Sequence, residues 1–157
     1  MALADGYVAS FGTKYADPFW RPVTAIREAD TDGNRRTTAD PGWTPLEGTP
    51  PIPEHDSAHA VEGGAAAAVL ARFFGTDAIA FSTCSRTLPD GGSCSDPEPV
   101  LRHFTSFSQA AAENADSRVY IGFHFRHAVE EGNRRGERIG RYVARTLLEP
   151  EHGRPHH

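Results

Sequence analysis

Three separated segments carry cationic, hydroxyl and imidazole side chains of the kinds that bind a tetrahedral oxyanion. The first contains Lys14 and Arg21, seven residues apart. This spacing returns to nearly the same face of a helix, so the two cations could converge, although Pro18 must perturb the backbone between them. Taken alone, the pair fits a solvated basic face better than a binding site.

The second segment is PPIPEHDSAH at residues 50–59, immediately before an apolar run. Its prolines favour an extended approach, and Asp56 or Ser57 can cap a following helix whose first N–H groups are free to meet an anion. Ser57 adds a hydroxyl donor, and His59 adds a group that holds or releases a proton near neutral pH. By itself, the segment fits a plain helix cap with a surface histidine.

The third segment is SRVYIGFH, in which Arg118 and His124 stand six residues apart. On an ideal helix their side chains would point about 120° apart and lie about 9 Å apart along the axis. A shared ligand therefore requires a long reach by Arg118 or a bend of the backbone near Gly122. Judged in isolation, an arginine at the edge of the core and a satisfied histidine explain the segment better.

In chain order the segments read K-x6-RP, P-x3-SAH and SR-x5-H. This order resembles the signature of the type 2 phosphatidic acid phosphatase and vanadium-dependent haloperoxidase superfamily. The stretches FWRPVTAIREADTDGN, TPPIPEHDSAH and SRVYIGFHFR are similar to its bacterial vanadium haloperoxidase-related branch in particular. The resemblance covers about residues 5–145, and ordered agreement at three separated motifs is hard to reach by chance.

The resemblance implies an all-α helical bundle with a buried pocket for vanadate, or for phosphate as a competing ligand. It assigns the oxyanion's contacts to three cations and two further donors: Lys14, Arg21, Arg118, the Ser57 hydroxyl and the Ala58 backbone N–H. His59 would be the acid–base residue. His124 would be the ligand of vanadium in a haloperoxidase, which acts on peroxide and halide, or the nucleophile on phosphorus in a phosphatase, which hydrolyses a phosphate ester.

Departures from the family pattern weigh on the choice between these activities. Asp56 and Ala58 stand where the middle motif usually has proline and glycine, and the negative charge of Asp56 should weaken anion binding. The phosphatase pattern places an aspartate where this chain has Ala128, although Glu130 or Glu131 could substitute. We therefore favour a vanadium-dependent haloperoxidase-like enzyme over an acid phosphatase, with a non-catalytic oxyanion-binding or assembly subunit as a third possibility.

The composition limits the partners. The chain has 157 residues, of which 38% are hydrophobic, enough for one domain with a core. A net charge of -5 provides no overall positive field for nucleic acid or an anionic membrane. The absence of a long apolar run argues against a membrane span, and leaves both export and a cytoplasmic location open. Cys84 and Cys94 could form a disulfide or remain free thiols.

Alanine-rich and apolar runs at helical spacing favour an all-α domain over residues 1–148, followed by a disordered tail at 149–157. We expect helices over residues 2–15, 18–29, 57–74, 97–115 and 117–148, the last with an apolar face formed by Ile139, Val143 and Leu147. The proline-rich stretch 30–56 should be irregular, and its length suggests a functional role.

The position of the first motif bears on the assembly. Family members generally carry a substantial helical region before K-x6-RP, whereas this motif begins at residue 14 here. We therefore expect the N-terminal helices of the bundle to be missing. Either the chain is truncated, or a partner chain or a second copy of the chain completes the bundle as a homo-oligomer.

Overall fold

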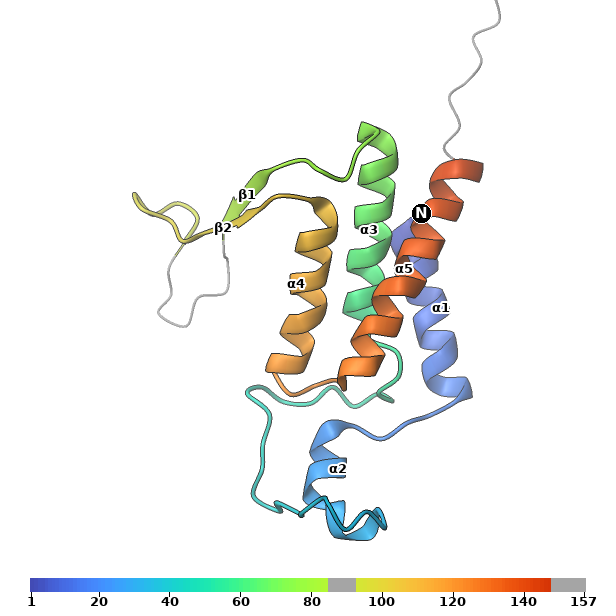
Figure 1. Cartoon of the computed structure of the whole chain (residues 1–157), viewed down its shortest axis with the longest axis vertical. Coiled ribbons are helices and arrows are strands. Elements are labelled where there is room, and N and C mark those ends of the chain that lie inside the picture. Colours follow the sequence, from blue (N-terminus) through green and yellow to red (C-terminus); the bar gives the residue numbers. More distant parts are fainter. Residues whose placement is uncertain (85–92, 148–157) are drawn as a thin grey trace, which may run out of the picture.

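The computed structural model describes residues 1–84 and 93–147, so the predicted tail at 149–157 lies outside the described residues. Figure 1 shows α3 (Ala58–Phe74) and α5 (Arg126–Thr146) side by side, with α4 (Phe107–Tyr120) next to α3 and α1 (Ala2–Ala16) beside α5. The helical bundle expected from the sequence is therefore confirmed. No helix among the described residues is long and apolar enough to cross a membrane.

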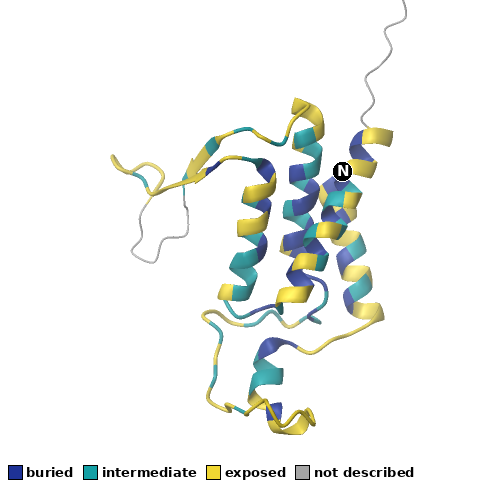
Figure 2. Cartoon of the chain, viewed as in Figure 1, coloured by how far each residue is buried: buried dark blue, intermediate teal, exposed yellow. Residues whose placement is uncertain are grey.

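The packing of α3 against α5 depends on glycine. Gly132, Gly136 and Gly140 recur every fourth residue along α5 and face α3. A methyl group added at Gly136 would lie 2.0 Å from the backbone oxygen of Val61. The two backbones thus approach more closely than any side chain on this face would allow. Figure 2 shows the buried residues concentrated where these helices meet.

The last predicted helix is divided in two. Arg118 lies in the last turn of α4, Gly122 adopts a left-handed φ of 85°, and α5 begins only at Arg126. This is the backbone bend near Gly122 that a shared ligand of Arg118 and His124 requires. The predicted apolar face is only partly right, because Val143 is buried whereas Leu147 is exposed.

The predicted helix over 97–115 is wrong in its first part. β2 (Leu101–Phe104) pairs antiparallel with β1 (Phe81–Cys84), and α4 begins later, where the Ser106 hydroxyl accepts a hydrogen bond from Gln109 N–H at 3.0 Å. Backbone pairing across the hairpin overrides local helix propensity here. Cys84 and Cys94 form a disulfide within this hairpin, which answers the question that the sequence left open.

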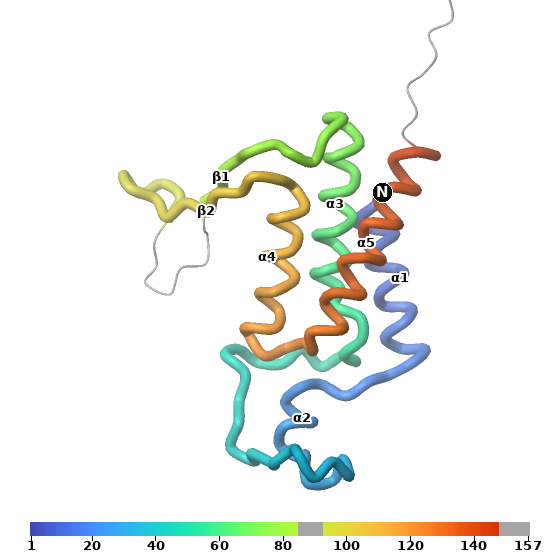
Figure 3. Tube along the Cα trace, viewed as in Figure 1, coloured from blue at the N-terminus to red at the C-terminus, as the bar shows by residue number. Residues whose placement is uncertain are grey.

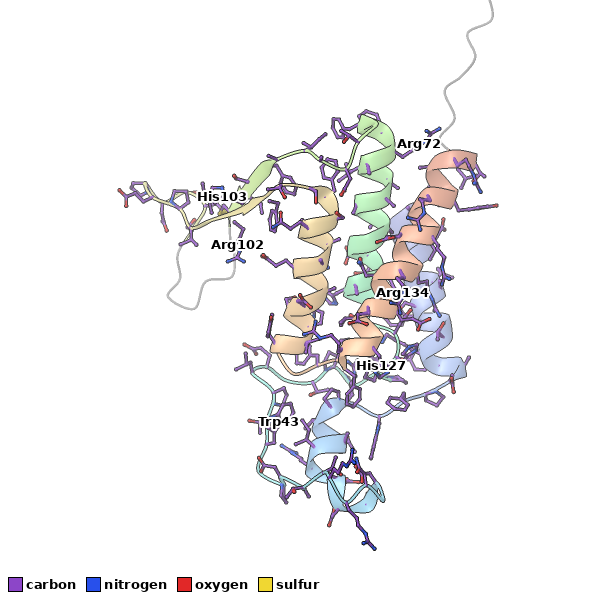
Figure 4. All side chains as sticks on the ribbon, in the orientation of Figure 1. Trp43, Arg72, Arg102, His103, His127 and Arg134 are labelled. Atoms are coloured by element: carbon purple, nitrogen blue, oxygen red, sulfur yellow. A yellow bond between two sulfur atoms is a disulfide. The ribbon has the colours of Figure 1, made fainter. Side chains whose placement is uncertain are left out.

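The remaining segments cross one end of the bundle. α2 (Pro22–Arg27), the short 3-10 helix η1 (Ala29–Thr31) and the irregular chain up to residue 57 lie at the end where α4 turns into α5 (Figure 3). Trp43, labelled in Figure 4, packs so closely on Gly122 that an added methyl group there would lie 2.8 Å from its ring. The irregular segment thereby closes this end of the bundle.

Candidate oxyanion site

His124 lies at the centre of a buried polar cluster just before α5. Its Nδ1 atom is 2.9 Å from Oε1 of Glu54, and its Nε2 atom is 3.2 Å from Nη1 of Arg21. The Arg21 guanidinium also donates to the carbonyl oxygens of Ile52, Pro53 and Phe123 at 2.9–3.3 Å. Arg21 therefore ties the irregular segment to the turn that carries His124.

Lys14 approaches the same segment from α1. The side chain is only 1% exposed, and its ammonium donates to the carbonyl oxygens of Pro53 and Glu54 at 3.0 and 2.8 Å. Burial, and then the positive charge of Arg21, lower the pKa of Lys14 to about 8. Lys14 and Arg21 do not share one helix face, since α1 ends at Ala16. Both cations instead donate hydrogen bonds to the residues that precede Ser57.

Arg118 and His59 complete the group. The Arg118 guanidinium carbon lies 5.2 Å from the centre of the Phe123 ring, and its Nε is buried without a hydrogen-bond partner among the described residues. Partial burial, followed by the charge of Arg118, lowers the pKa of His59. Burial lowers the pKa of Arg21, and the charge of Arg118 adds to this lowering. His59 lies in the first turn of α3 and is partly open to solvent. Charges from all three motifs therefore act on one another.

Ser57 and Ala58 form the N-terminus of α3 beside this cluster. The buried Ser57 hydroxyl accepts from Ala60 N–H at 3.4 Å, as the capping role predicts, and its backbone N–H donates to Ala128 O at 3.2 Å. The position where the phosphatase pattern has an aspartate, Ala128, therefore contacts the motif through its backbone carbonyl. The cap brings the first N–H groups of a 17-residue helix to the site.

The donor set fits a tetrahedral oxyanion bonded to one imidazole. Lys14 uses two of its three ammonium hydrogens on the contacts named above. Arg118 Nε has an unsatisfied donor, while one oxygen of each nearby carboxylate, Oε1 of Glu54 and Oδ1 of Asp56, already accepts a hydrogen bond. Vanadate would therefore meet available donors, with the Nε2 lone pair of His124 as a ligand.

Comparison with known proteins agrees with this geometry. The family model of the VCPO second helical-bundle domain matches residues 1–152. The chain belongs to this family. The superfamily assignment made from the three motifs is therefore confirmed.

Individual relatives of this VCPO-type domain are vanadium enzymes. Vanadium chloroperoxidase from Curvularia inaequalis is 28% identical over 80% of this chain and 26% of its own length. A bacterial vanadium-dependent iodoperoxidase is 36% identical over 92% of this chain and 31% of its own, with a TM-score of 0.74. An apo bacterial vanadium-dependent chloroperoxidase, 21% identical with a TM-score of 0.72, shares the fold over 94% of this chain and 34% of its own. The chain thus spans about a quarter to a third of these relatives.

In this VCPO-type domain, Glu54 was not among the site residues predicted from the sequence. Glu130 or Glu131 was the expected carboxylate partner of His124, but the carboxylate that contacts His124 comes from the segment before Ser57. Burial opposes ionisation of Glu54, yet the hydrogen bonds from His124 and from Phe125 N–H outweigh burial and lower its pKa. The feature of the sequence that indicated Glu54 was its position among prolines in the stretch PPIPEHDSAH.

Asp56 is also placed differently from the expectation. Its buried carboxylate accepts from the Ser10 hydroxyl at 2.7 Å and forms an ion pair with Arg135 at 3.2 Å. Those partners lie on α1 and α5. The charge expected to weaken anion binding is therefore paired, and it joins two helices to the segment that carries Ser57.

Replacing Asp56 with alanine should destabilise the domain by about 3 kcal/mol, because it leaves Arg135 and Ser10 without their buried partner. Chemical denaturation monitored by circular dichroism measures this loss. Glu137→Ala is the matched control, since it removes an exposed ion pair with Arg141 and should cost less than about 1 kcal/mol. An equal loss of unfolding free energy in the two variants would contradict the role of buried Asp56 in joining α1 and α5.

Proposed function

We propose that this domain binds vanadate and serves a vanadium-dependent haloperoxidase-like enzyme, which oxidises halide with hydrogen peroxide. The observation that carries the proposal is the contact of Arg21 with Nε2 of His124, in a cluster that also contains Lys14 and lies beside Arg118 and Ser57. When bound, vanadate would supply Lewis-acid activation of peroxide. The names of the relatives give independent support.

The residues of the chain would divide the work. Lys14, Arg21 and Arg118 would balance the negative charge of the oxyanion, with Ser57 and the Ala58 N–H as further donors. His124 would hold the vanadium through Nε2. The lowered pKa of His59 leaves its imidazole neutral near pH 7, so that it can accept a proton from arriving peroxide.

Halide oxidation by the purified protein tests the proposal. With vanadate, peroxide and bromide, the protein should brominate a phenolic dye in proportion to the amount of bound vanadate. Bound vanadate without bromide or iodide oxidation would contradict the proposal and favour a non-catalytic oxyanion-binding role. If neither vanadate nor phosphate stabilises the protein against heat, both the haloperoxidase proposal and the oxyanion-binding role are contradicted.

Acid phosphatase activity is the second candidate, and the Glu54–His124 contact favours it. Nε2 of His124 would bond to phosphorus as the ester P–O bond breaks, the leaving oxygen would take a proton from His59, and water would then cleave the phosphohistidine. Because the pKa of His59 is lowered, its acidic form is scarce near pH 7. Hydrolysis of a chromogenic phosphate ester should therefore rise as the pH falls below 7 and be inhibited by vanadate; no hydrolysis at acidic pH would exclude this reaction.

The affinity for a tetrahedral dianion should fall with rising pH. The pKa of Lys14 is about 8, so raising the pH from 7 to 9 removes most of its positive charge. Sulfate keeps a constant charge over this range, and its affinity should fall by about tenfold. Titration calorimetry at each pH measures this change. In Lys14→Met the affinity should be low and nearly independent of pH, and an unchanged pH profile would contradict the role of Lys14.

We also propose that a second copy or a partner chain covers the outer face of α1. That face exposes Val8, Phe11 and Tyr15, of which Val8 is 75% exposed. Beside α1, a groove of about 360 Å³ is lined by Leu3, Leu70 and Val143 among others. Analytical ultracentrifugation should show self-association that Val8→Glu weakens. A monomer at every concentration would contradict the second copy.

A further inference from the structure

Glu54 is a buried carboxylate with no established role. Its side chain is fully buried, Oε1 meets both His124 Nδ1 and Phe125 N–H, and Oε2 has no hydrogen-bond partner among the described residues. Burying a carboxylate with one oxygen unsatisfied is costly, and an apolar side chain would avoid this cost. The burial of this carboxylate therefore indicates that Glu54 has a role other than stabilising the fold.

The backbone of Glu54 is held on both sides. Its N–H donates to Phe19 O at 3.0 Å, and its carbonyl oxygen accepts from the Lys14 ammonium at 2.8 Å. Phe125 N–H then holds the side-chain oxygen at 3.0 Å. The carboxylate therefore has little freedom to leave His124, as a positioning group requires.

The two neighbours of the His124 ring determine where its proton lies. Arg21 has only donors, so Nε2, 3.2 Å from Nη1, must be the acceptor and carry no hydrogen. Nδ1 then carries the hydrogen and donates it to Oε1 of Glu54. Only in this tautomer does Nε2 keep a lone pair, which accepts from Arg21 here and would bond an atom in the site once Arg21 releases it.

We propose that Glu54 is the positioning residue that holds His124 in this tautomer and strengthens the bond of Nε2 to the central atom of a bound oxyanion. A carboxylate behind a histidine ligand fixes its ring and raises its basicity. The bonding part of the inference rests on the proposed function. The tautomer is a property of the chain without any ligand.

The charge of Glu54 should favour vanadate over phosphate. Phosphate held only by cations is repelled by a nearby carboxylate, whereas vanadate bonded to Nε2 gains from the more basic ring. Glu54→Gln preserves size and an acceptor oxygen but removes the charge. A purely structural role would change both affinities in the same direction, so their ratio separates the two roles.

Nitrogen NMR of ligand-free protein tests the tautomer. In the wild type, His124 should carry its hydrogen on Nδ1, and Glu54→Gln should retain it through the amide oxygen. Glu54→Ala should show a mixture of tautomers. Glu130→Gln, which changes an exposed carboxylate on α5, is the matched control. A hydrogen on Nε2 in the wild type would overturn the proposal even if Glu54→Ala does not fold.

Titration calorimetry with vanadate and with inorganic phosphate tests the bonding. In Glu54→Gln the ratio of vanadate to phosphate affinity should fall by about tenfold, and Glu54→Ala should bind vanadate about 10–100-fold more weakly than the wild type. An unchanged ratio in folded Glu54→Gln would overturn the bonding role. If the wild type binds neither ion, the proposed function and the bonding role fail together, whereas the NMR result still decides the positioning role.

Discussion

His124→Ala should lose vanadate-dependent halide oxidation by about three orders of magnitude or more, the scale seen when a group central to the chemistry is removed. The imidazole contacts the Arg21 and Glu54 side chains, and among the described residues no other histidine has a hydrogen bond to either of them. Without Nε2, vanadate would be held only by charge and hydrogen bonds. Calorimetry should therefore show a large loss of vanadate affinity together with a much smaller change for phosphate.

The control for this experiment is His103→Ala. His103, labelled in Figure 4, lies on β2 of the hairpin, where its ring shares a hydrogen bond with the exposed Ser82 hydroxyl. Its removal should leave both affinities unchanged. Circular dichroism verifies that His124→Ala is folded, since Glu54 loses its partner in that variant. Full halide oxidation by folded His124→Ala would contradict the assignment of the vanadium ligand.

Gly136→Ala should destabilise the bundle by about 3 kcal/mol and lower the melting temperature by about 10 °C. The added methyl group would lie 2.0 Å from Val61 O, and also within 2.9 Å of Ala65 N. Backbone atoms inside a helix cannot rotate away as a side chain can. Relief therefore requires α3 and α5 to separate, which also pulls on Ser57 and His59 at the start of α3.

Gly12→Ala is the matched control for helix propensity. Gly12 is exposed on α1, and an added methyl group would find nothing within 4 Å. The substitution should therefore stabilise the domain by about 0.5–1 kcal/mol through propensity alone. Differential scanning calorimetry of both variants measures the contrast. A stabilised Gly136→Ala would show that α3 and α5 are not in backbone contact.

The superfamily, the helical bundle and the three motifs could be recognised from the amino-acid order, because a motif is a local arrangement of residue types. The start of α3 at Ser57 and its end at Gly75 were also predictable, since a hydroxyl cap and a left-handed glycine act on their own turn of helix. Gly122 was correctly suspected as a bend for the same reason. Such features depend on neighbours in the chain.

Other features depend on which segments meet in space. The hairpin of β1 and β2 needs a partner strand 17 residues further on, from Cys84 to Leu101, that no local pattern announces. Glu54 became the partner of His124, 70 residues away, and Asp56 found Ser10 and Arg135 on two helices. The sequence determines which charged groups are present, but long-range packing determines their partners. The physical reason is that a buried charge is tolerated only where the folded chain supplies a group of opposite charge or a hydrogen-bond partner.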